Sequence, residues 1–441
     1  MPTCSARRST VRPASKPSPR SIGTVVAVSR IVETVAPARL GGSFRWLMAS
    51  SWLSNLGDGL ALAAGPLLVA SQTDAPLLVA LAVLLQWLPP LAFALFAGAL
   101  ADRVNRRTIV VIVDTARAAV LVLLSLVIVT GQVSVGVVLA SLFTLATAEV
   151  FADNASSTLL PMLVNRSDLA IGNARLQTGF LTLNQLAGPP LGAALFVAGS
   201  AWPFATQAVL VAFGALLVSR VVLPGEQREG RGPSRVRTDI AEGFAWVRRH
   251  AAVRTLVLTI FIFNITFGAA WSILVLYARD QLGLGEIGFG LVTTVSAVGG
   301  LAGTAAYGWI TRRVSLGDLM RIGLLVETFT HLGLALTTIP AVALVIFFVF
   351  GAHAFVWGAT SITVRQRAVP QELQGRVGSV NTVGVYGGLV IGAGIGGLVA
   401  QRWGVTAPFW FAFVGSAIFV VLIWRELTHI AHDDADVLEH R

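Results

Sequence analysis

Long apolar runs recur along almost the whole chain, and each one is long enough to cross a membrane. A helix needs about 20 apolar residues to span about 30 Å of hydrocarbon. With 55% hydrophobic and only 12% charged residues, the chain has too little charge to cover the surface of a water-soluble fold. We therefore expect an all-α membrane protein with twelve transmembrane helices, centred near Leu60, Leu88, Leu121, Leu145, Leu183, Leu210, Phe263, Val298, Val326, Phe347, Val390 and Phe413.

The 32 Lys and Arg residues are divided very unevenly between the two sides of this arrangement. Arg279 and Arg402 fall in loops on one side and Arg117 falls within a span, whereas all the others lie on the opposite side. Basic loops remain on the cytoplasmic side of inner-membrane proteins. We therefore expect a multi-pass protein of the bacterial inner membrane with both termini in the cytoplasm. The net charge of +10 then reflects topology, and no nucleic-acid partner is expected.

The longest polar break starts at Pro224 and divides the spans into two sets of six. After it, Ile240, Phe244 and Val247 share a helical face that excludes Glu242. This pattern indicates either a short helix on the cytoplasmic leaflet or simply the start of the seventh span. The expected organisation is a disordered basic tail, a six-helix bundle, a linker, a second six-helix bundle and a second tail, at residues 1–43, 44–223, 224–250, 251–425 and 426–441.

The sequence lacks the usual signals of enzymes and metal sites. Its single cysteine, Cys4, excludes an intrachain disulfide and a thiolate metal site, and His429, His432 and His440 are too loosely spaced for metal ligation. It contains no Gly-x-x-x-x-Gly-Lys-Ser/Thr phosphate loop, no His-Glu-x-x-His pair and no Gly-x-Ser-x-Gly turn. We therefore expect no enzyme, no cofactor, no metal and no direct use of ATP.

A distinctive loop follows the second apolar run, with the sequence Gly98-Ala-Leu-Ala-Asp102-Arg-Val-Asn105-Arg106-Arg107, and a vestigial copy, Gly-Trp-Ile-Thr-Arg-Arg, ends the eighth run. The loop resembles the Gly-x-x-x-Asp-x-x-Gly-Arg-Arg/Lys signature of the major facilitator superfamily. That resemblance implies two pseudo-symmetric six-helix bundles with a site between them. Asn105 departs from the family glycine, although Asn tolerates the left-handed turn expected there.

The resemblance also implies that this loop takes part in gating. Gly98 would let a neighbouring helix approach closely, and Asp102 would accept hydrogen bonds from amides at the start of that neighbour. Arg106 would pair with an acid on another helix, and Asp153 in the fourth span is the candidate.

Glycine patterns mark two further spans. Gly188-Pro189-Pro190-Leu-Gly192 in span five resembles the Gly-Pro-x-x-Gly-Gly element of the antiporter branch, with Ala193 in the last place. The resemblance implies export, and the alternative is that Gly-Pro merely kinks and packs a helix. Span eleven carries a stripe that we expect to pack tightly and to slide on span two, formed by Gly384, Gly388, Gly392 and Gly396.

Two longer stretches, residues 159–194 and 364–398, resemble the branch that contains the enterobactin exporter and macrolide efflux proteins. The residues that carry this resemblance are Leu160-Pro161, Asn173-Ala-Arg, Arg365-Gln366, Val369-Pro370 and Gly375-Arg376-Val377. Members of that branch move quite different cargo, so the resemblance implies export without identifying the substrate.

Ionisable residues inside a span cost about 2.5–3.5 kcal/mol near its centre on insertion scales, and therefore indicate function. Asp58 and Glu149 lie deep in their spans without a cation nearby in the sequence. We expect Asp58, and after it Glu149, to carry the coupling proton. Glu327 and His331 form an i,i+4 pair, for which a proton relay and a structural role remain alternatives.

Other polar residues in the spans receive structural or cargo-binding predictions. Asp114 and Arg117 lie three residues apart, and we expect them to form a mainly structural ion pair. Amide and indole groups at mid-span suit a mostly apolar cavity for amphiphilic molecules, although Trp also anchors at interfaces and amides bridge helices. These cavity candidates are Asn55, Gln86, Trp87, Gln177, Gln185, Asn264, Trp271 and Trp357.

Together these patterns predict a secondary transporter, monomeric in the lipid bilayer, that works by alternating access. We expect proton-coupled export of amphiphilic small molecules such as drugs or siderophore-like metabolites. The alternative within transport is a proton-coupled importer of a nutrient or metabolite. The alternative from another class is a membrane-embedded enzyme or sensor.

Overall fold

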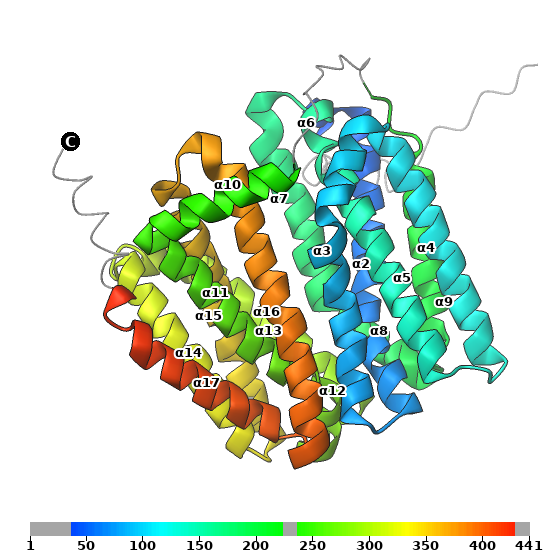
Figure 1. The fold of residues 1–441 in the computed structure, drawn as a ribbon. Helices are drawn as coiled ribbons and strands as arrows, with labels where there is room; N and C mark the ends of the chain where they lie inside the picture. Colours follow the sequence, from blue (N-terminus) through cyan, green and yellow to red (C-terminus); the bar gives the residue numbers. More distant parts are fainter. Residues whose placement is uncertain (1–36, 224–235, 428–441) are drawn as a thin grey trace, which may run out of the picture.

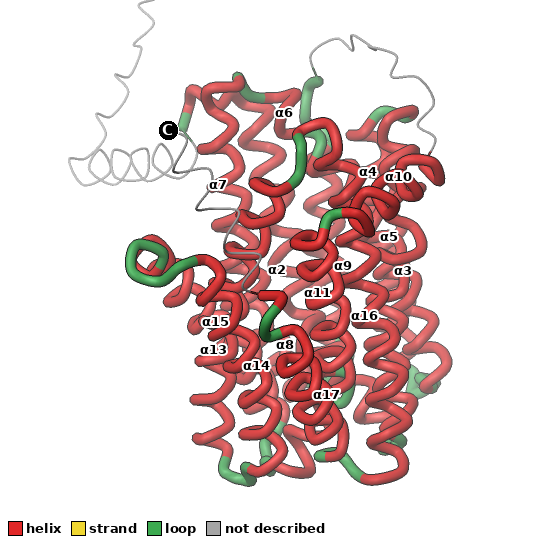
Figure 2. The backbone as a smooth tube through the Cα atoms, turned by 60° about the vertical axis from the view of Figure 1, so that its left-hand side comes forward, coloured by secondary structure: helices red, strands yellow, loops and turns green. Residues whose placement is uncertain are grey.

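The structure is a computed structural model that describes residues 37–223 and 236–427. In that part of the chain every regular element is a helix, and the loops are turns near the ends of the helices (Figures 1 and 2). Cys4, residues 224–235 of the expected linker, and His429, His432 and His440 lie outside the described residues.

The first half of the chain supplies six helical stretches. They are α2 (Gly41–Gln72), α3 (Pro76–Arg103), α4 (Arg106–Val129), α5 (Val135–Ser157), the combined run of α7 (Leu169–Gly179), the π-helix η3 (Phe180–Ala187) and α8 (Gly188–Ala198), and α9 (Trp202–Val218). Three shorter elements lie at their ends, namely η1 (Ala38–Leu40), α6 (Leu160–Leu163) and η2 (Arg166–Asp168).

The second half repeats this plan after the separate helix α10 (Val236–Arg249). Its long helices are α11 (Ala251–Trp271), α13 (Glu286–Ile310), α14 (Leu316–Leu336), α15 (Pro340–Ala368), α16 (Gln374–Trp403) and α17 (Ala407–Ile423). Short elements follow α11 and α15, namely α12 (Leu274–Leu276), η4 (Tyr277–Gln281) and η5 (Gln371–Leu373).

The described residues contain ten helical stretches that are long and apolar enough to cross a membrane. Two more apolar helices, α9 and α17, are 17 residues long, which is close to the lower limit for a span. They stand where the sixth and twelfth spans were expected. The predicted all-helical membrane fold is confirmed, and the expected count of twelve is reached only when these two shorter helices are included.

Prolines and glycines set several helix boundaries. Pro76 and Pro340 open α3 and α15, at positions where the missing amide hydrogen has no intrahelical partner to lose. Gly404 ends α16 at φ 89°, and Gly131 turns the chain after α4 at φ 70°. Both glycines adopt a left-handed conformation that other residues rarely take.

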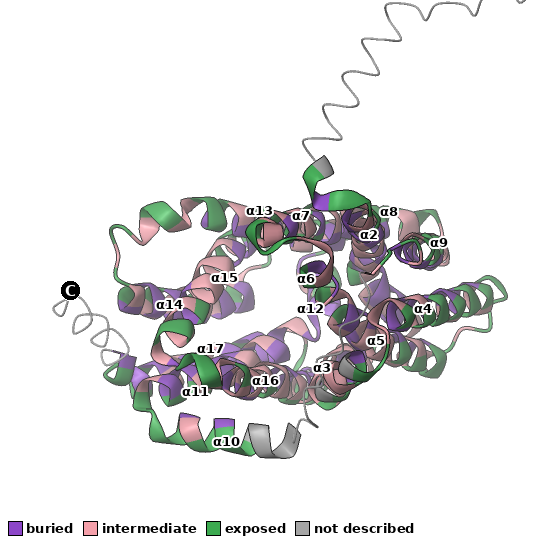
Figure 3. Cartoon of the chain, turned by 90° about the horizontal axis from the view of Figure 1, so that it is seen from above, coloured by how far each residue is buried: buried purple, intermediate pink, exposed green. Residues whose placement is uncertain are grey.

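The helices form two groups that lie side by side when the molecule is seen from above (Figure 3). In the first group α2 packs on α8 and α9, and α4 packs on α5 and α9. In the second group α11 packs on α16 and α17, and α15 packs on α13 and α14. The two groups meet mainly through α3 against α16 and α8 against α13.

We call the end of the molecule that holds the α3–α4 turn and α10 the basic end, and the end that holds the α2–α3 turn the opposite end (Figure 1). At the opposite end an ion pair of 2.9 Å joins Asp74 of the first group to Arg279 of the second. Nearby, the Leu77 amide donates to the Gln401 side chain at 3.4 Å. These contacts tie the two groups together at the opposite end.

Helix α10 is separated from α11 by His250. Its Glu242 forms an ion pair of 2.7 Å with Arg376 at the start of α16. The sequence predicted that Val247 and Phe244 lie on one apolar face of this helix. Val247 is buried whereas Phe244 is exposed, so the two residues differ in their surroundings. The side chain of Ile240 lies outside the described ones. The position of α10 on the leaflet surface stays a prediction.

Two expectations about glycines are wrong. Among the described residues, a Cβ atom on Gly98 would have no neighbour within 4 Å, so the expected close approach of a neighbouring helix is not seen there. The α16 stripe faces α11 rather than α3, because a Cβ on Gly388 or Gly392 would collide with the α11 backbone. A different face of α16 meets α3, where a Cβ on Gly397 would lie 2.7 Å from Ala80 Cβ. The stripe is therefore a packing surface within the second group.

Candidate functional site

A buried guanidinium lies at the centre of the polar residues of the first half. Arg117 of α4 has a side chain that is only 4% exposed, and it contacts Asp58 of α2 at 2.5 Å and Asp114 at 3.0 Å. Gln207 of α9 also donates to Asp58, at 3.1 Å. Arg117 therefore joins two helices through charge-assisted hydrogen bonds, which are stronger than neutral ones.

The expected pair of Asp114 and Arg117 is present, but it is only part of this cluster. Asp58 has no cation near it in the sequence, but the packing of α4 on α2 brings Arg117 to it from another span. An arginine side chain does not lose its proton in proteins, so Arg117 presents a fixed positive charge to both carboxyl groups. This arrangement makes Asp58 a counter-ion of Arg117.

A polar cavity of about 310 Å³ surrounds the cluster. Residues from α2, α4, α5, α7 and η3 line it, all from the first half of the chain. Two further carboxyl groups, those of Glu149 and Asp153 on α5, face it. Ser156 and Asn173, which lie close to the helix ends at the basic end, also line it. The cavity therefore extends toward the basic end of the molecule.

The charges around this cavity are unbalanced. Four carboxyl groups, those of Asp58, Asp114, Glu149 and Asp153, share one guanidinium. In the described part of the chain Glu149 forms neither a hydrogen bond nor an ion pair. The charges of Arg117 and of the other three acids nevertheless act on it. A low-dielectric cavity with excess acid attracts cations and protons.

Only two of the predicted cargo residues line this cavity, Asn55 and Gln177. Among the others, Gln86 and Asn264 donate to carbonyl groups one turn back on their own helices, and Gln185 donates to Asn184 at 2.6 Å. These amides satisfy local hydrogen bonds.

Two of the three predicted cargo tryptophans belong to an aromatic cluster that spans the two groups. Trp87 of α3 lies 6.5 Å from Phe267 of α11, measured between ring centroids. Phe267 stacks on Trp271 at 4.4 Å, and Phe350 of α15 lies 4.7 Å from Trp271. Trp357 lies apart from these stacks, beside Gly323. The second half thus presents mainly aromatic surface near the contact with the first half.

The expected pairing of Glu327 with His331 is wrong. Glu327 of α14 instead lies 3.7 Å from His353 of α15, measured from Oε2 to Nε2. His331 is fully buried, and Trp271 meets its ring edge-on at a centroid distance of 6.3 Å. The packing of α14 against α15 decides the pairing, because it brings a closer imidazole to Glu327 than the one on the same helix.

The loop predicted to gate the transporter forms a capped turn. Asn105 has φ −59°, so the left-handed turn expected there does not form, and its side chain accepts from the Thr108 amide as the N-cap of α4. Arg106 donates to the Ala101 carbonyl at 3.2 Å, and Arg107 donates to the Val221 carbonyl at 2.9 Å. The side chain of Asp102 lies outside the described ones.

The predicted antiporter element packs α8 against α2. A Cβ on Gly188 would collide with the backbone of Gly59, and one on Gly192 would collide with that of Leu60. Just before Gly188-Pro189 the chain forms the π-helix η3, and Thr294 of α13 donates to the Leu186 carbonyl there at 3.4 Å. π-Helical turns often occur at functional sites. Here the turn places Asn184 against the polar cavity.

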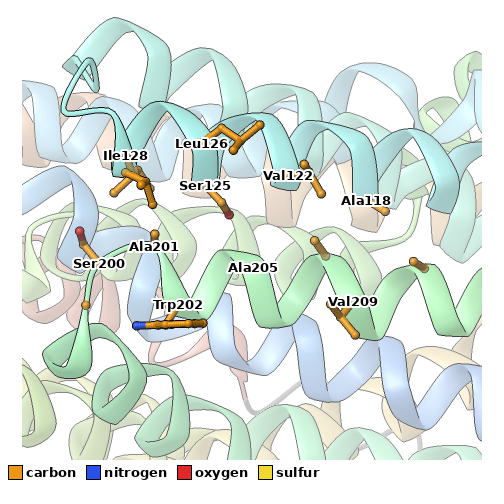
Figure 4. A pocket seen from close by; sticks show the side chains of 14 residues that line it. Ala118, Val122, Ser125, Leu126, Ile128, Ser200, Ala201, Trp202, Ala205 and Val209 are labelled. Atoms are coloured by element: carbon orange, nitrogen blue, oxygen red, sulfur yellow. The ribbon is translucent and has the colours of Figure 1, made fainter.

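A larger hollow of about 680 Å³ lies between α4 and α9 (Figure 4). Its lining is almost entirely apolar and carries no charged residue. Val122, Leu126, Trp202 and Val209 line it and are exposed. Exposed apolar residues on a membrane protein face lipid. This groove therefore belongs to the lipid-facing surface and is separate from the polar cavity.

Several polar residues at or near the site escaped the sequence prediction, among them Asn184, Gln207 and Tyr386. Asn184 and Gln207 were hidden within apolar runs, and only the fold shows that they meet the acids. Tyr386 of α16 has Glu149 and Asp153 as electrostatic neighbours across the contact between the halves. Its position one residue before Gly387-Gly388 was the only signal in the sequence.

Comparison with protein families gives one match that covers nearly the whole chain. A family model of major facilitator transporters, described as "Transmembrane secretion effector" (MFS_3), matches residues 32–440. Among curated proteins, the multidrug efflux pump Tap of Mycolicibacterium fortuitum is 27% identical over 81% of this chain and 88% of its own length. The macrolide efflux protein A of Streptococcus pyogenes is 23% identical over 80% of this chain and 88% of its own length.

Solved structures agree on the fold. A mutant of the nucleoside transporter NupG has a TM-score of 0.72 at 12% identity and covers 87% of this chain and 100% of its own. A bacterial homologue of the iron transporter ferroportin, in an inward-facing state, has a TM-score of 0.67 at 18% identity and covers 87% and 98%. At these identities the likeness shows the fold alone.

Proposed function

Because the chain belongs to the transmembrane secretion effector family of major facilitator transporters, we propose that it exports amphiphilic small molecules in exchange for protons. The halves would rock about the polar cavity, so that it opens alternately to the two sides. The basic end lies in the cytoplasm in this proposal, because basic loops remain on that side. The efflux function of both curated relatives supports the direction.

The observation that carries the proposal is the excess of acid in the polar cavity. Four carboxyl groups and one guanidinium give it a negative character, and the aromatic cluster between α3 and α11 offers apolar and cation–π surface at the contact between the halves. A route that combines these two features suits an amphiphilic cation. The cargo class that we propose is therefore an organic molecule with a positively charged amine or a delocalised cation.

Glu149 carries the coupling proton in this mechanism. Asp58 and Asp114 form ion pairs with Arg117, whereas Glu149 faces the same cavity without a direct ionic contact among the described residues. A cationic cargo that enters the cavity favours the ionised form of Glu149 and displaces its proton. A proton that binds from the other side displaces the cargo. The competition couples the two movements.

The decisive experiment uses inside-out membrane vesicles with an acidified interior and a pH-sensitive dye. Macrolides, tetracyclines, cationic dyes, catechol siderophores and tetraphenylphosphonium are added in turn. We expect the cationic compounds to cause proton efflux that vesicles without the protein do not show. Proton movement in the same direction as a nutrient would establish import instead, and a response to anionic compounds alone would contradict the cation assignment.

A further inference from the structure

The second half of the molecule contains its own buried carboxyl group. Glu327 lies near the middle of α14 and His353 near the middle of α15, and their side chains are 14% and 7% exposed. The two groups are 3.7 Å apart. The proposed function does not use this pair, since it lies outside the polar cavity of the first half.

The chemistry of the partner distinguishes this carboxyl group from Asp58. Arginine remains charged in proteins, so Arg117 presents Asp58 with a fixed positive charge. Histidine loses its proton near neutral pH, so a carboxyl–imidazole pair changes its total charge by one when a single proton leaves. Because a net charge is costly at membrane depth, the pair Glu327–His353 holds a proton when it is shut away from water.

No fixed cation stands near the pair in the described part of the chain. On α14 the next titratable group is His331, and Arg321 further along pairs with Asp318 at 3.3 Å. Helix α17, which packs on α14, contains no titratable residue. On α13, which packs on α15, Glu286 lies at the first position and Tyr307 near the last turn. The charge of the pair is therefore set by its own protons.

The surroundings of the pair leave buried nitrogen atoms without hydrogen bonds. Trp357 and His331 each lie one turn from the pair, on the same helix faces as His353 and Glu327. Trp357 Nε1 and both ring nitrogens of His331 are buried and have no partner among the described residues. A Cβ on Gly323 would lie 3.1 Å from the His353 ring, so glycine makes room for the imidazole. Since unsatisfied buried groups cost about 1–3 kcal/mol each, the packing around the pair does not maximise the hydrogen bonds of the nearby polar groups.

From these contacts we infer that Glu327 and His353 form a second proton-binding site, and that each transport cycle exchanges two protons for one cargo molecule. This inference rests on the proposed function, in which Glu149 carries the other proton. Exchange of one proton for a monovalent cation moves no net charge, so only the pH gradient drives it. A second proton makes the exchange electrogenic, and the membrane potential then adds a driving force of about 2.3 kcal/mol per 100 mV.

The test counts the protons that cargo binding releases from the purified full-length protein. Saturating tetraphenylphosphonium, a cation that does not titrate, is added in weakly buffered detergent with a pH dye. We expect about two protons per bound cation from the wild type, and about one from either Glu327→Gln or Glu149→Gln, since each variant removes one titratable carboxyl. Glu286→Gln, at an exposed position at the start of α13, serves as the matched control and should release two.

The outcomes separate the inference from the proposed function. If the wild type releases one proton and Glu327→Gln releases the same number, the second site is wrong and the proposed function stands. A Glu327→Gln variant with a lowered melting temperature but an unchanged proton count would show a structural pair and also overturn the inference. No release from the wild type overturns both.

Discussion

The two halves of this molecule share a packing plan and differ in chemistry. In the first half, Gly192 of α8 meets the backbone of Leu60 on α2, and in the second half Gly392 of α16 meets that of Ile265 on α11. These are the fifth and first helices of each half, so the contacts are equivalent. The polar residues are not. The first half gathers four acids around Arg117, whereas the second half pairs one acid with a histidine beside aromatic rings.

This difference indicates that two halves with the same helix packing can carry different functional residues. Close glycine contacts fix helix positions in both halves, which requires small residues but no particular charge. The ionisable residues are then free to differ, and in the proposed function the first half is the side that binds the cation. The comparison can be tested by changing matched residues in the two halves.

The largest effect is expected from Arg117→Met. It leaves Asp58 and Asp114 without their cation, and breaking a buried ion pair typically costs about 3–5 kcal/mol. We expect a large fall in melting temperature in detergent and loss of transport. Glu327→Gln in the second half should cost much less, because its partner is a more distant imidazole. Equal losses in the two variants would contradict the contrast between the halves.

The next effect concerns coupling. Glu149→Gln should reduce cargo-driven proton movement to about half while retaining exchange of labelled cargo for unlabelled cargo, because one of the two titratable carboxyl groups is lost. Asp58→Asn should retain proton movement and lower stability, because it leaves Arg117 with one carboxyl partner fewer. Proton flux and cargo exchange are measured in the same proteoliposomes. If Asp58→Asn uncouples proton movement from cargo exchange and Glu149→Gln does not, then Asp58 carries the coupling proton.

A smaller and symmetric effect is expected at the packing glycines. Gly192→Val and Gly392→Val should each destabilise the protein by about 1–3 kcal/mol, because the added atoms would overlap a neighbouring backbone. Gly98→Val, at a site with no neighbour within 4 Å of the Cβ position, is the matched control and should leave the melting temperature nearly unchanged. A large loss at only one of the first two positions would break the equivalence of the halves.

The smallest effect is expected at the opposite end. Asp74→Asn removes an exposed ion pair with Arg279, and such pairs contribute about 0–1 kcal/mol. We expect nearly unchanged melting but faster labelling of a cysteine introduced at the polar cavity by a reagent added from the opposite end. An unchanged labelling rate would show that this ion pair does not hold the halves together.

The sequence predicts the spans and the polar residues well, because apolar length and membrane-buried charge leave strong local signals. It does not predict which polar groups meet. Arg117 reaches Asp58 from another span, and Glu327 meets His353 rather than the nearer residue in sequence, His331. For the same reason, the sequence analysis expected the glycine stripe of α16 to face the second span, whereas it faces α11. Helix rotation and neighbour choice depend on tertiary packing, which a single sequence does not display.

The central claim is that protons and a cationic cargo compete for the acids of the first half, and the pH dependence of binding tests it most directly. Tetraphenylphosphonium affinity is measured by quenching of tryptophan fluorescence between pH 5.5 and pH 8. In the wild type we expect affinity to fall as the pH falls, by up to about tenfold per pH unit for each proton displaced, and in Glu149→Gln we expect a markedly weaker dependence. Affinity that does not change with pH in the wild type would contradict the account.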